Sequence, residues 1–195
     1  MSTHYRITES HSYDEAANLI FFGDGTSRAY EGIEIKIVIY RERMKTWFFE
    51  VARGIVKDGG APGDYLVLMM GIACLEGIEQ FRQGKRTPQG KSGEWFKNSA
   101  KRVFPGHDED VYQRIWEETR CGLFHMAFPS GKIYLAYAQD SPLLIEGDKL
   151  MIHPAKFLEQ IEADFCLYIA SIENEENTQL RSAFEELWDL LWDAT

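Results

Sequence analysis

The 195-residue sequence has few cysteines and no long apolar run. Its three cysteines, Cys74, Cys121 and Cys166, lie more than forty residues apart and form neither a CxxC pair nor a zinc-finger spacing with histidine. This pattern excludes a disulfide framework and is typical of a reducing compartment. No apolar run reaches the ~18 residues of a membrane-spanning helix, and the N-terminus lacks a signal-type apolar stretch. We therefore expect a cytoplasmic protein with no membrane partner.

Common catalytic and cofactor signatures are also missing. The sequence contains no GxSxG, HExxH, GxGxxG or EF-hand spacing. Residues 84–92 spell GKRTPQGKS, which resembles a phosphate-binding P-loop. However, five residues separate the two glycines instead of four, and the segment follows a predicted helix where a P-loop follows a strand. We therefore expect no metal and no cofactor.

Acidic residues outnumber basic ones, and the formal net charge of -10 argues against nonspecific binding to nucleic acid. The charge is uneven, however, because residues 1–106 carry +2 and residues 107–195 carry -12. Between Arg82 and Arg102 there is one acid, Glu94, and there are seven bases: Arg82, Lys85, Arg86, Lys91, Lys97, Lys101 and Arg102. This basic segment is interpreted either as a solvated face or as a surface that binds RNA phosphate.

The spacing of apolar residues predicts mostly helices. A three-and-four spacing is typical of amphipathic helices, and it covers residues 30–55, 65–83, 94–104, 108–126, 154–172 and 178–191. Within the first of these, Ile33, Ile35, Ile37 and Ile39 alternate, so a short strand over 33–40 is the alternative. Short strands are expected between 132 and 153. The predicted fold class is mainly α, an up-and-down helical bundle with a small β-hairpin insertion.

Three arginines are followed five residues later by a histidine. Arg6 and His11 lie in the polar N-terminal stretch, and Arg102 and His107 flank a Pro-Gly pair that interrupts a helix. Only the segment Arg120-CGLF-His125 lies within a continuous predicted helix. It is therefore the candidate for a paired functional site.

At these residues the sequence resembles the HEPN superfamily, whose mark is an arginine and a histidine with four to six residues between them on a bundle helix. The resemblance implies a HEPN-like bundle over 30–172 with the β insertion at about 132–153. Residues 1–29 are then an N-terminal extension, and 173–195 form a C-terminal helix packed on the same domain. It also implies a metal-independent endoribonuclease of toxin or defence type, with an antitoxin or other protein partner.

The same resemblance assigns roles to the pair. His125 would move protons near neutral pH, and the planar guanidinium of Arg120 would hold the RNA phosphate. Residues five apart point ~140° away from each other on a regular helix. Either a local bulge at Gly122 or a homodimer that pools two motif helices would therefore be needed. The alternative is a catalytically inactive HEPN-like module that binds a nucleotide or a protein.

Neighbouring residues leave the role of the pair open. Glu76 and Glu117 are candidates to orient Arg120, and an ordinary ion pair of Arg120 with Glu76, Glu79 or Glu117 is the competing interpretation. His125 is likewise open to interpretation as a histidine at the edge of the core. Trp188 and Trp192, four residues apart, are interpreted as core or dimer contacts.

Overall fold

A computed structural model describes residues 4–58, 61–126, 129 and 131–192. The described residues are 62% helical and form six continuous helices and two small β-sheets. The fold is therefore mixed α and β, and the prediction of a mainly α, HEPN-like up-and-down bundle was wrong. The helices lie close to their predicted positions, so the error comes from the strands.

The first sheet occupies the segment predicted to be an N-terminal extension. Strands β1 (His4–Arg6), β2 (His11–Asp14), β3 (Leu19–Phe22) and β4 (Ser27–Ala29) form an antiparallel meander. Each strand has only three or four residues, too few for the alternation of apolar and polar residues to stand out. Ile7 and Ile20 from this segment are buried, so the sheet contributes to the core.

The first long helix is continuous from residue 33 to 58. It consists of α1 (Ile33–Arg43), a π-helical turn η1 (Met44–Phe49) and α2 (Glu50–Asp58), which confirms the helix and excludes the strand over 33–40. Ile35, Ile37 and Ile39 are all buried. The alternation arises because α1 has neighbours on more than one side, including α7 and α8.

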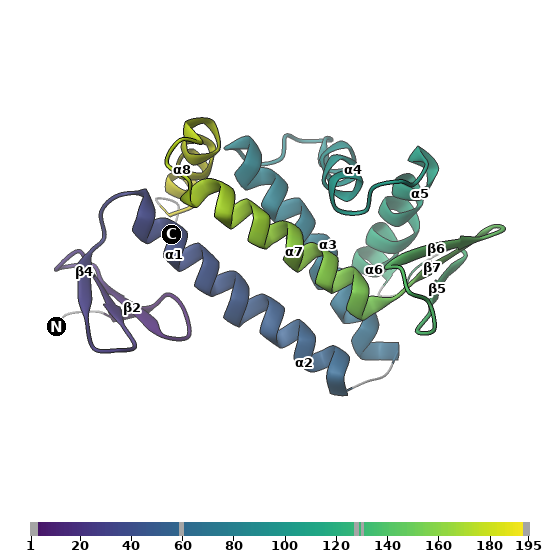
Figure 1. Cartoon of the computed structure of the whole chain (residues 1–195), viewed down its shortest axis with the longest axis horizontal. Coiled ribbons are helices and arrows are strands. Elements are labelled where there is room, and N and C mark those ends of the chain that lie inside the picture. Colours follow the sequence, from purple (N-terminus) through teal and green to yellow (C-terminus); the bar gives the residue numbers. More distant parts are fainter. Residues whose placement is uncertain (1–3, 59–60, 127–128, 130, 193–195) are drawn as a thin grey trace.

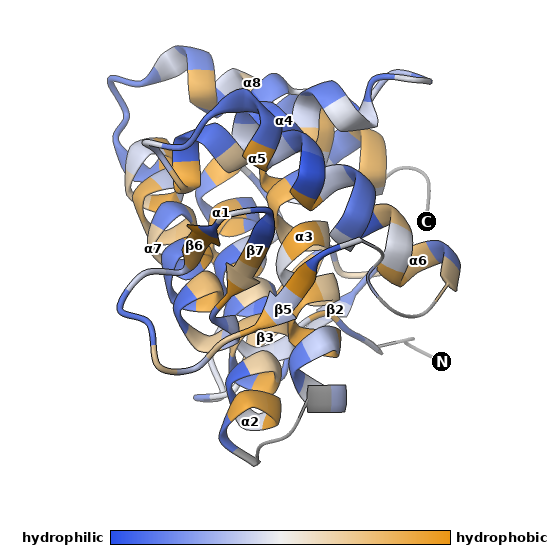
Figure 2. Cartoon of the chain, turned by 90° about the vertical axis from the view of Figure 1, so that its right-hand side faces the viewer, coloured by the Kyte–Doolittle hydropathy of each residue, from blue (hydrophilic) through white to orange (hydrophobic). Residues whose placement is uncertain are grey.

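Helix α3 (Ala61–Gln83) is the centre of the helical layer. Val67, Leu68, Ile72, Leu75 and Ile78 have no exposed surface. The helix contacts α4 (Ser92–Val103), α7 (Pro154–Glu173) and α8 (Thr178–Trp192), as well as α2. Figure 1 shows α7 running alongside α1 and α3, and Figure 2 shows the apolar residues gathered where the helices face one another.

The motif helix begins at α5 (Glu109–Arg114), passes through a second π-helical segment, η2 (Ile115–Cys121), and ends in α6 (Gly122–Met126). The insertion that follows is a three-stranded mixed sheet and not a hairpin alone. Strands β6 (Leu143–Glu146) and β7 (Lys149–Ile152) form the hairpin, and β5 (Ile133–Leu135) pairs with β7 in parallel. A parallel pair needs a crossover that local sequence patterns do not reveal. The two sheets lie at opposite ends of the molecule (Figure 1).

Among the residues that the structure describes, no helix is both long enough and apolar enough to cross a membrane.

We predict that Gly84→Ala destabilises the protein more than Gly90→Ala. Both glycines have a positive φ, +67° and +78°, which costs any other residue about 1 kcal/mol or more. At Gly84 a Cβ would also come within 2.9 Å of the Cα of Ala183 in α8, whereas at Gly90 nothing lies within 4 Å. Urea unfolding measures both free energies. Equal losses would show that the close approach of α8 to the end of α3 does not constrain position 84.

Candidate functional site

Arg120 lies at the end of the π-helical segment and points toward α3. Its Nε donates a 3.0 Å hydrogen bond to Glu76 Oε1, and both side chains are about one-fifth exposed. The guanidinium lies over two aromatic rings of its own helix, 4.6 Å from the centre of Trp116 and 5.0 Å from that of Phe124. One ion pair and two cation–π contacts therefore fix the Arg120 side chain.

The two candidate orienting residues differ. Glu76 binds Arg120 directly, whereas Glu117 accepts a 2.6 Å hydrogen bond from Gln113. Glu79, the third acid considered for Arg120, binds Arg102 at 2.6 Å. Of the three acids, therefore, only Glu76 contacts Arg120 within the described part of the chain.

His125 lies in α6 and is exposed, which does not favour its interpretation as a histidine at the edge of the core. No hydrogen bond or ring contact joins it to Arg120 among the described residues. The π-helical segment ends at Cys121, directly before Gly122, where a bulge was considered. The backbone hydrogen bonds of a π-helix join residues five apart, so each residue turns less about the helix axis than in an α-helix. This smaller turn narrows the angle between the directions of the Arg120 and His125 side chains. The five-residue interval itself is mostly α-helical, so one chain does not bring the two side chains into contact.

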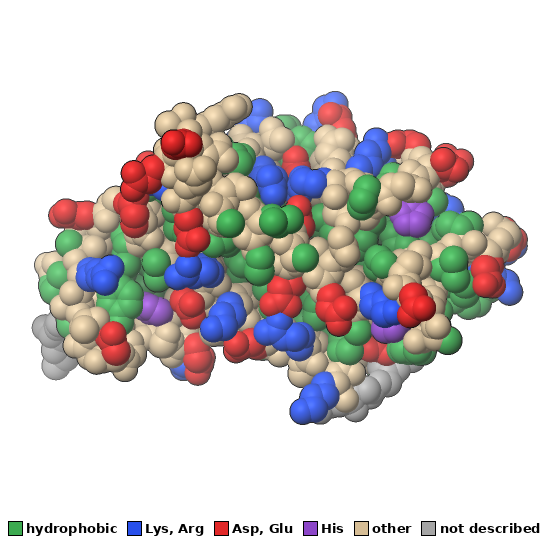
Figure 3. All heavy atoms as spheres, viewed as in Figure 1, with side chains coloured by type: hydrophobic (Ala, Val, Ile, Leu, Met, Phe, Trp, Pro, Cys, Tyr) green, Lys and Arg blue, Asp and Glu red, His purple; other side chains and the backbone are tan. Residues whose placement is uncertain are grey.

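The exposed part of the basic segment is largely paired with acids. Lys91 bonds Glu94 at 2.8 Å, and Lys101 bonds Glu109 at 2.5 Å. Lys97 also reaches Glu109, at 3.6 Å, and hydrogen bonds with these lysines, chiefly Lys101, lower the pKa of the Glu109 carboxyl. Figure 3 shows acidic and basic side chains interleaved over one face of the molecule.

Lys85 and Arg86 are the exposed bases of this segment without an ion pair among the described residues. Two free bases offer far less phosphate contact than seven, because affinity for RNA grows with the number of phosphates neutralised.

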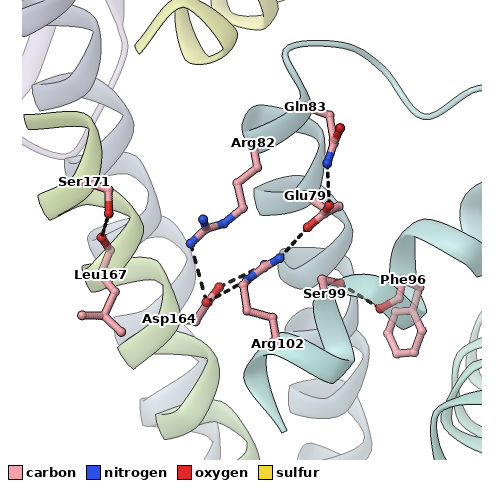
Figure 4. Close-up of polar contacts among 9 residues, drawn as sticks. All are labelled: Glu79, Arg82, Gln83, Phe96, Ser99, Arg102, Asp164, Leu167 and Ser171. Carbon is pink, nitrogen blue, oxygen red and sulfur yellow. Dashed lines mark hydrogen bonds and ion pairs between the residues drawn. The ribbon is translucent and has the colours of Figure 1, made fainter. Parts of the chain in front are cut away.

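The remaining two bases, Arg82 and Arg102, point inward and join a network between helices (Figure 4). Arg102 in α4 donates to both carboxylate oxygens of Asp164 in α7, at 2.9 and 3.2 Å, and to Glu79 in α3 at 2.6 Å. Arg82 lies 3.6 Å from Asp164. Two arginines and two acids thus tie α3, α4 and α7 together with no net charge.

Burial and hydrogen bonding shift the pKa values of these arginines in opposite directions. Burial lowers the pKa of the Arg82 guanidinium, and the neighbouring Arg102 lowers it further. Burial also opposes the charge of Arg102, but its hydrogen bonds with Asp164 and Glu79 outweigh that effect and raise its pKa. Arg82 also lies 4.8 Å from the centre of the Tyr168 ring, which offsets part of its burial.

Comparison with known proteins adds no family: no family model, no curated protein and no solved structure matches this chain. The HEPN resemblance therefore remains a prediction that rests on Arg120 and His125 in their helical context.

The sequence also left a second group of residues unassigned. Tyr13, Tyr40, Arg43, Trp188 and Trp192 line a cavity of about 820 Å³ near the first sheet. The only signal in the sequence is the four-residue spacing of Trp188 and Trp192, and the sequence analysis interprets these residues as core or dimer contacts. Nothing marked Arg43, because the contacts that define it come from the N-terminal segment and from α8.

We predict that Asp164→Ala lowers the free energy of unfolding by about 3 kcal/mol, because it leaves two partly buried guanidiniums without their shared carboxylate. The control is Glu173→Ala in the same helix, which removes the exposed pair with Arg41 and is expected to cost less than about 1 kcal/mol. Denaturant unfolding measures both. A loss at Asp164 no larger than at Glu173 would show that the network does not hold the helices together.

Proposed function

We propose that the protein is a HEPN-type, metal-independent endoribonuclease that uses Arg120 and His125. The observation that carries the proposal is that the Arg120 side chain is held in one orientation by its contacts. Its Nε is fixed by Glu76 and its plane is held by Trp116 and Phe124. The two terminal nitrogens have no partner among the described residues. A guanidinium held in this way is preorganised to bind a phosphate through its free edge.

The chemistry requires one proton to leave and another to arrive. As the 2′-oxygen of RNA attacks the adjacent phosphorus, the 2′-hydroxyl loses its proton, the bond to the 5′-oxygen breaks, and that oxygen takes up a proton. Histidine titrates near neutral pH and suits both transfers. Arg120 stabilises the charge that builds on the phosphate. The products are a 2′,3′-cyclic phosphate and a free 5′-hydroxyl.

One chain offers a single His125, whereas the reaction uses a base and an acid. A two-fold homodimer through the motif helix supplies two histidines and two arginines in one cleft. The surface around His125 supports this arrangement, because its neighbours Phe124 and Met126 are apolar and 44% and 50% exposed. Such side chains are typical of a surface that a partner covers. An antitoxin or other protein would then act by covering this cleft.

The alternative is a catalytically inactive module that binds a nucleotide or a protein. Two observations favour it: Glu76 neutralises Arg120, and acids pair with most of the basic segment. Both reduce the attraction for RNA. Activity measurements therefore decide between the two functions.

We expect purified protein to cut single-stranded RNA in EDTA and to leave a substrate with 2′-deoxyribose at every position intact. His125→Ala should lower the rate by at least about 100-fold, the usual contribution of an acid–base residue. Its control is His107→Ala, since His107 also follows an arginine by five residues but lies in a loop. Electrophoresis of labelled oligonucleotides measures the cleavage of both substrates by the wild-type protein and the cleavage of RNA by the two variants. Wild-type cleavage no faster than that of His125→Ala, or an equal loss in His107→Ala, would overturn the proposal.

We expect the wild-type protein to be a dimer and Phe124→Asp to be a monomer, because two carboxylates would face each other across the two-fold axis. Leu167→Asp in α7 is the control, since Leu167 is 68% exposed on another helix and should leave the dimer intact. Light scattering coupled to gel filtration measures the mass. A wild-type monomer at micromolar concentrations would contradict the pooled cleft.

A further inference from the structure

A second candidate site is a cavity that lies far from Arg120 and His125. It has a volume of about 820 Å³ and is enclosed by β1, β2, α1, η1, α3 and α8. These elements meet near the first sheet, whereas α6 lies toward the other end of the molecule (Figure 1). The volume falls within the range of small-molecule sites, which is about 300–1,000 Å³.

The cavity has a buried floor and an open rim. Ile7, Tyr40, Phe81 and Trp188 form the floor, and each is at most 9% exposed. Tyr5 and Leu191 lie at the rim, with 48% and 37% of their surfaces exposed. A ligand could therefore enter from solvent and reach an apolar interior.

The walls are formed largely by aromatic rings that hold one another in place. Trp188 and Trp192 are stacked with centroids 5.7 Å apart, and Trp192 stacks on Tyr30 at 4.8 Å. The indole N–H of Trp188 donates a 2.6 Å hydrogen bond to the Tyr30 hydroxyl. Tyr13 packs edge-on against Trp192 at 5.6 Å. These contacts fix flat apolar surfaces in advance of binding.

Arg43 places a half-buried positive charge in this aromatic wall. Its Nε donates a 2.6 Å hydrogen bond to the carbonyl of Ile7, and its guanidinium lies 5.6–5.8 Å from the centres of the Trp47, Trp188 and Trp192 rings. Among the described residues no carboxylate pairs with it. Burial lowers the pKa of Arg43, which reflects the cost of holding its charge there.

The other charged residues of the lining do not cancel this charge. Arg6 pairs with Glu9 at the surface, and both are more than 60% exposed. Glu15 is exposed and is the one acid among the lining residues. Within the part of the chain that the structure describes, the positive charge of Arg43 in this cavity is therefore uncompensated, although the protein has a net charge of -10.

We propose that this cavity binds a small molecule that combines a flat aromatic ring with an anionic group. The ring would stack on the tryptophan and tyrosine faces, and the anion would accept hydrogen bonds from the free edge of Arg43. An aromatic carboxylate and a nucleotide share this chemistry, because the planar guanidinium forms bidentate hydrogen bonds with both carboxylate and phosphate. A cationic ligand is disfavoured by Arg43, and a purely apolar one would leave its charge unpaired.

The test is titration of the full-length protein with four probes, followed by isothermal calorimetry and tryptophan fluorescence. AMP and indole-3-acetate carry both a ring and a charge, whereas adenosine and inorganic phosphate each carry only one. We expect saturable binding of at least one of the first pair, at least tenfold tighter than that of either single-feature probe. Binding of AMP would identify the anionic group as a phosphate, and binding of indole-3-acetate would identify it as a carboxylate. No saturable binding, or adenosine binding as tightly as AMP with no binding of indole-3-acetate, would overturn the proposal.

Two variants locate the site. Arg43→Met should weaken binding at least tenfold, whereas Arg41→Met, which removes an exposed arginine of the same helix, should not. Leu191→Asp places a carboxylate at the rim and should weaken binding, whereas Leu190→Asp, at a position 49% exposed and outside the lining, should not. The second pair keeps the test valid if Arg43→Met does not fold. Unchanged affinity in Leu191→Asp, or in a folded Arg43→Met, would overturn the proposal, and neither result depends on ribonuclease activity.

Discussion

The burial of α3 is the constraint on which the other elements depend. Five of its aliphatic side chains have no exposed surface, so neighbouring elements must cover the helix along most of its length. Gly71 shows how closely they approach, because a Cβ there would lie 3.0 Å from side-chain atoms of Phe157 and Ile161 in α7. The motif helix is one of these neighbours, since α6 also contacts α3. The position of Arg120 beside Glu76 therefore follows from covering α3.

The same burial explains why the network around Asp164 is needed. Glu79 lies on α3 among buried residues, where an isolated carboxylate would be costly. Arg102 from α4 and Asp164 from α7 bring opposite charges to it, so the charges compensate one another inside the helical layer. The network also fixes how α4 and α7 sit against α3, because the guanidinium of Arg102 binds both acids at once.

The helices could be predicted from the sequence because each has enough turns for its apolar spacing to be recognised. The strands of the first sheet could not, since a three-residue strand such as β1 offers no period. Short strands between 132 and 153 were expected, and β5, β6 and β7 lie there, but the parallel pairing of β5 with β7 joins distant segments and was not predicted. Arg120 and His125 could be selected because Pro105 and Gly106 removed their nearest competitor. The charge of the basic segment was misleading for a related reason: Glu109 and Asp164, which neutralise it, lie outside the segment in sequence.

Three arginines show what decides whether such a residue is available to a ligand. Arg102 is bound by two carboxylates, so its charge is neutralised by the ion pairs that hold the helices together. Arg120 shares its charge with one carboxylate through Nε, which fixes it but leaves its terminal nitrogens unbound among the described residues. Among the described residues Arg43 is held by a neutral carbonyl and by aromatic rings, and no carboxylate there offsets its charge. Because a half-buried charge without a counterion is costly, an anion should stabilise the fold most where it reaches Arg43, less at Arg120 and least at Arg102.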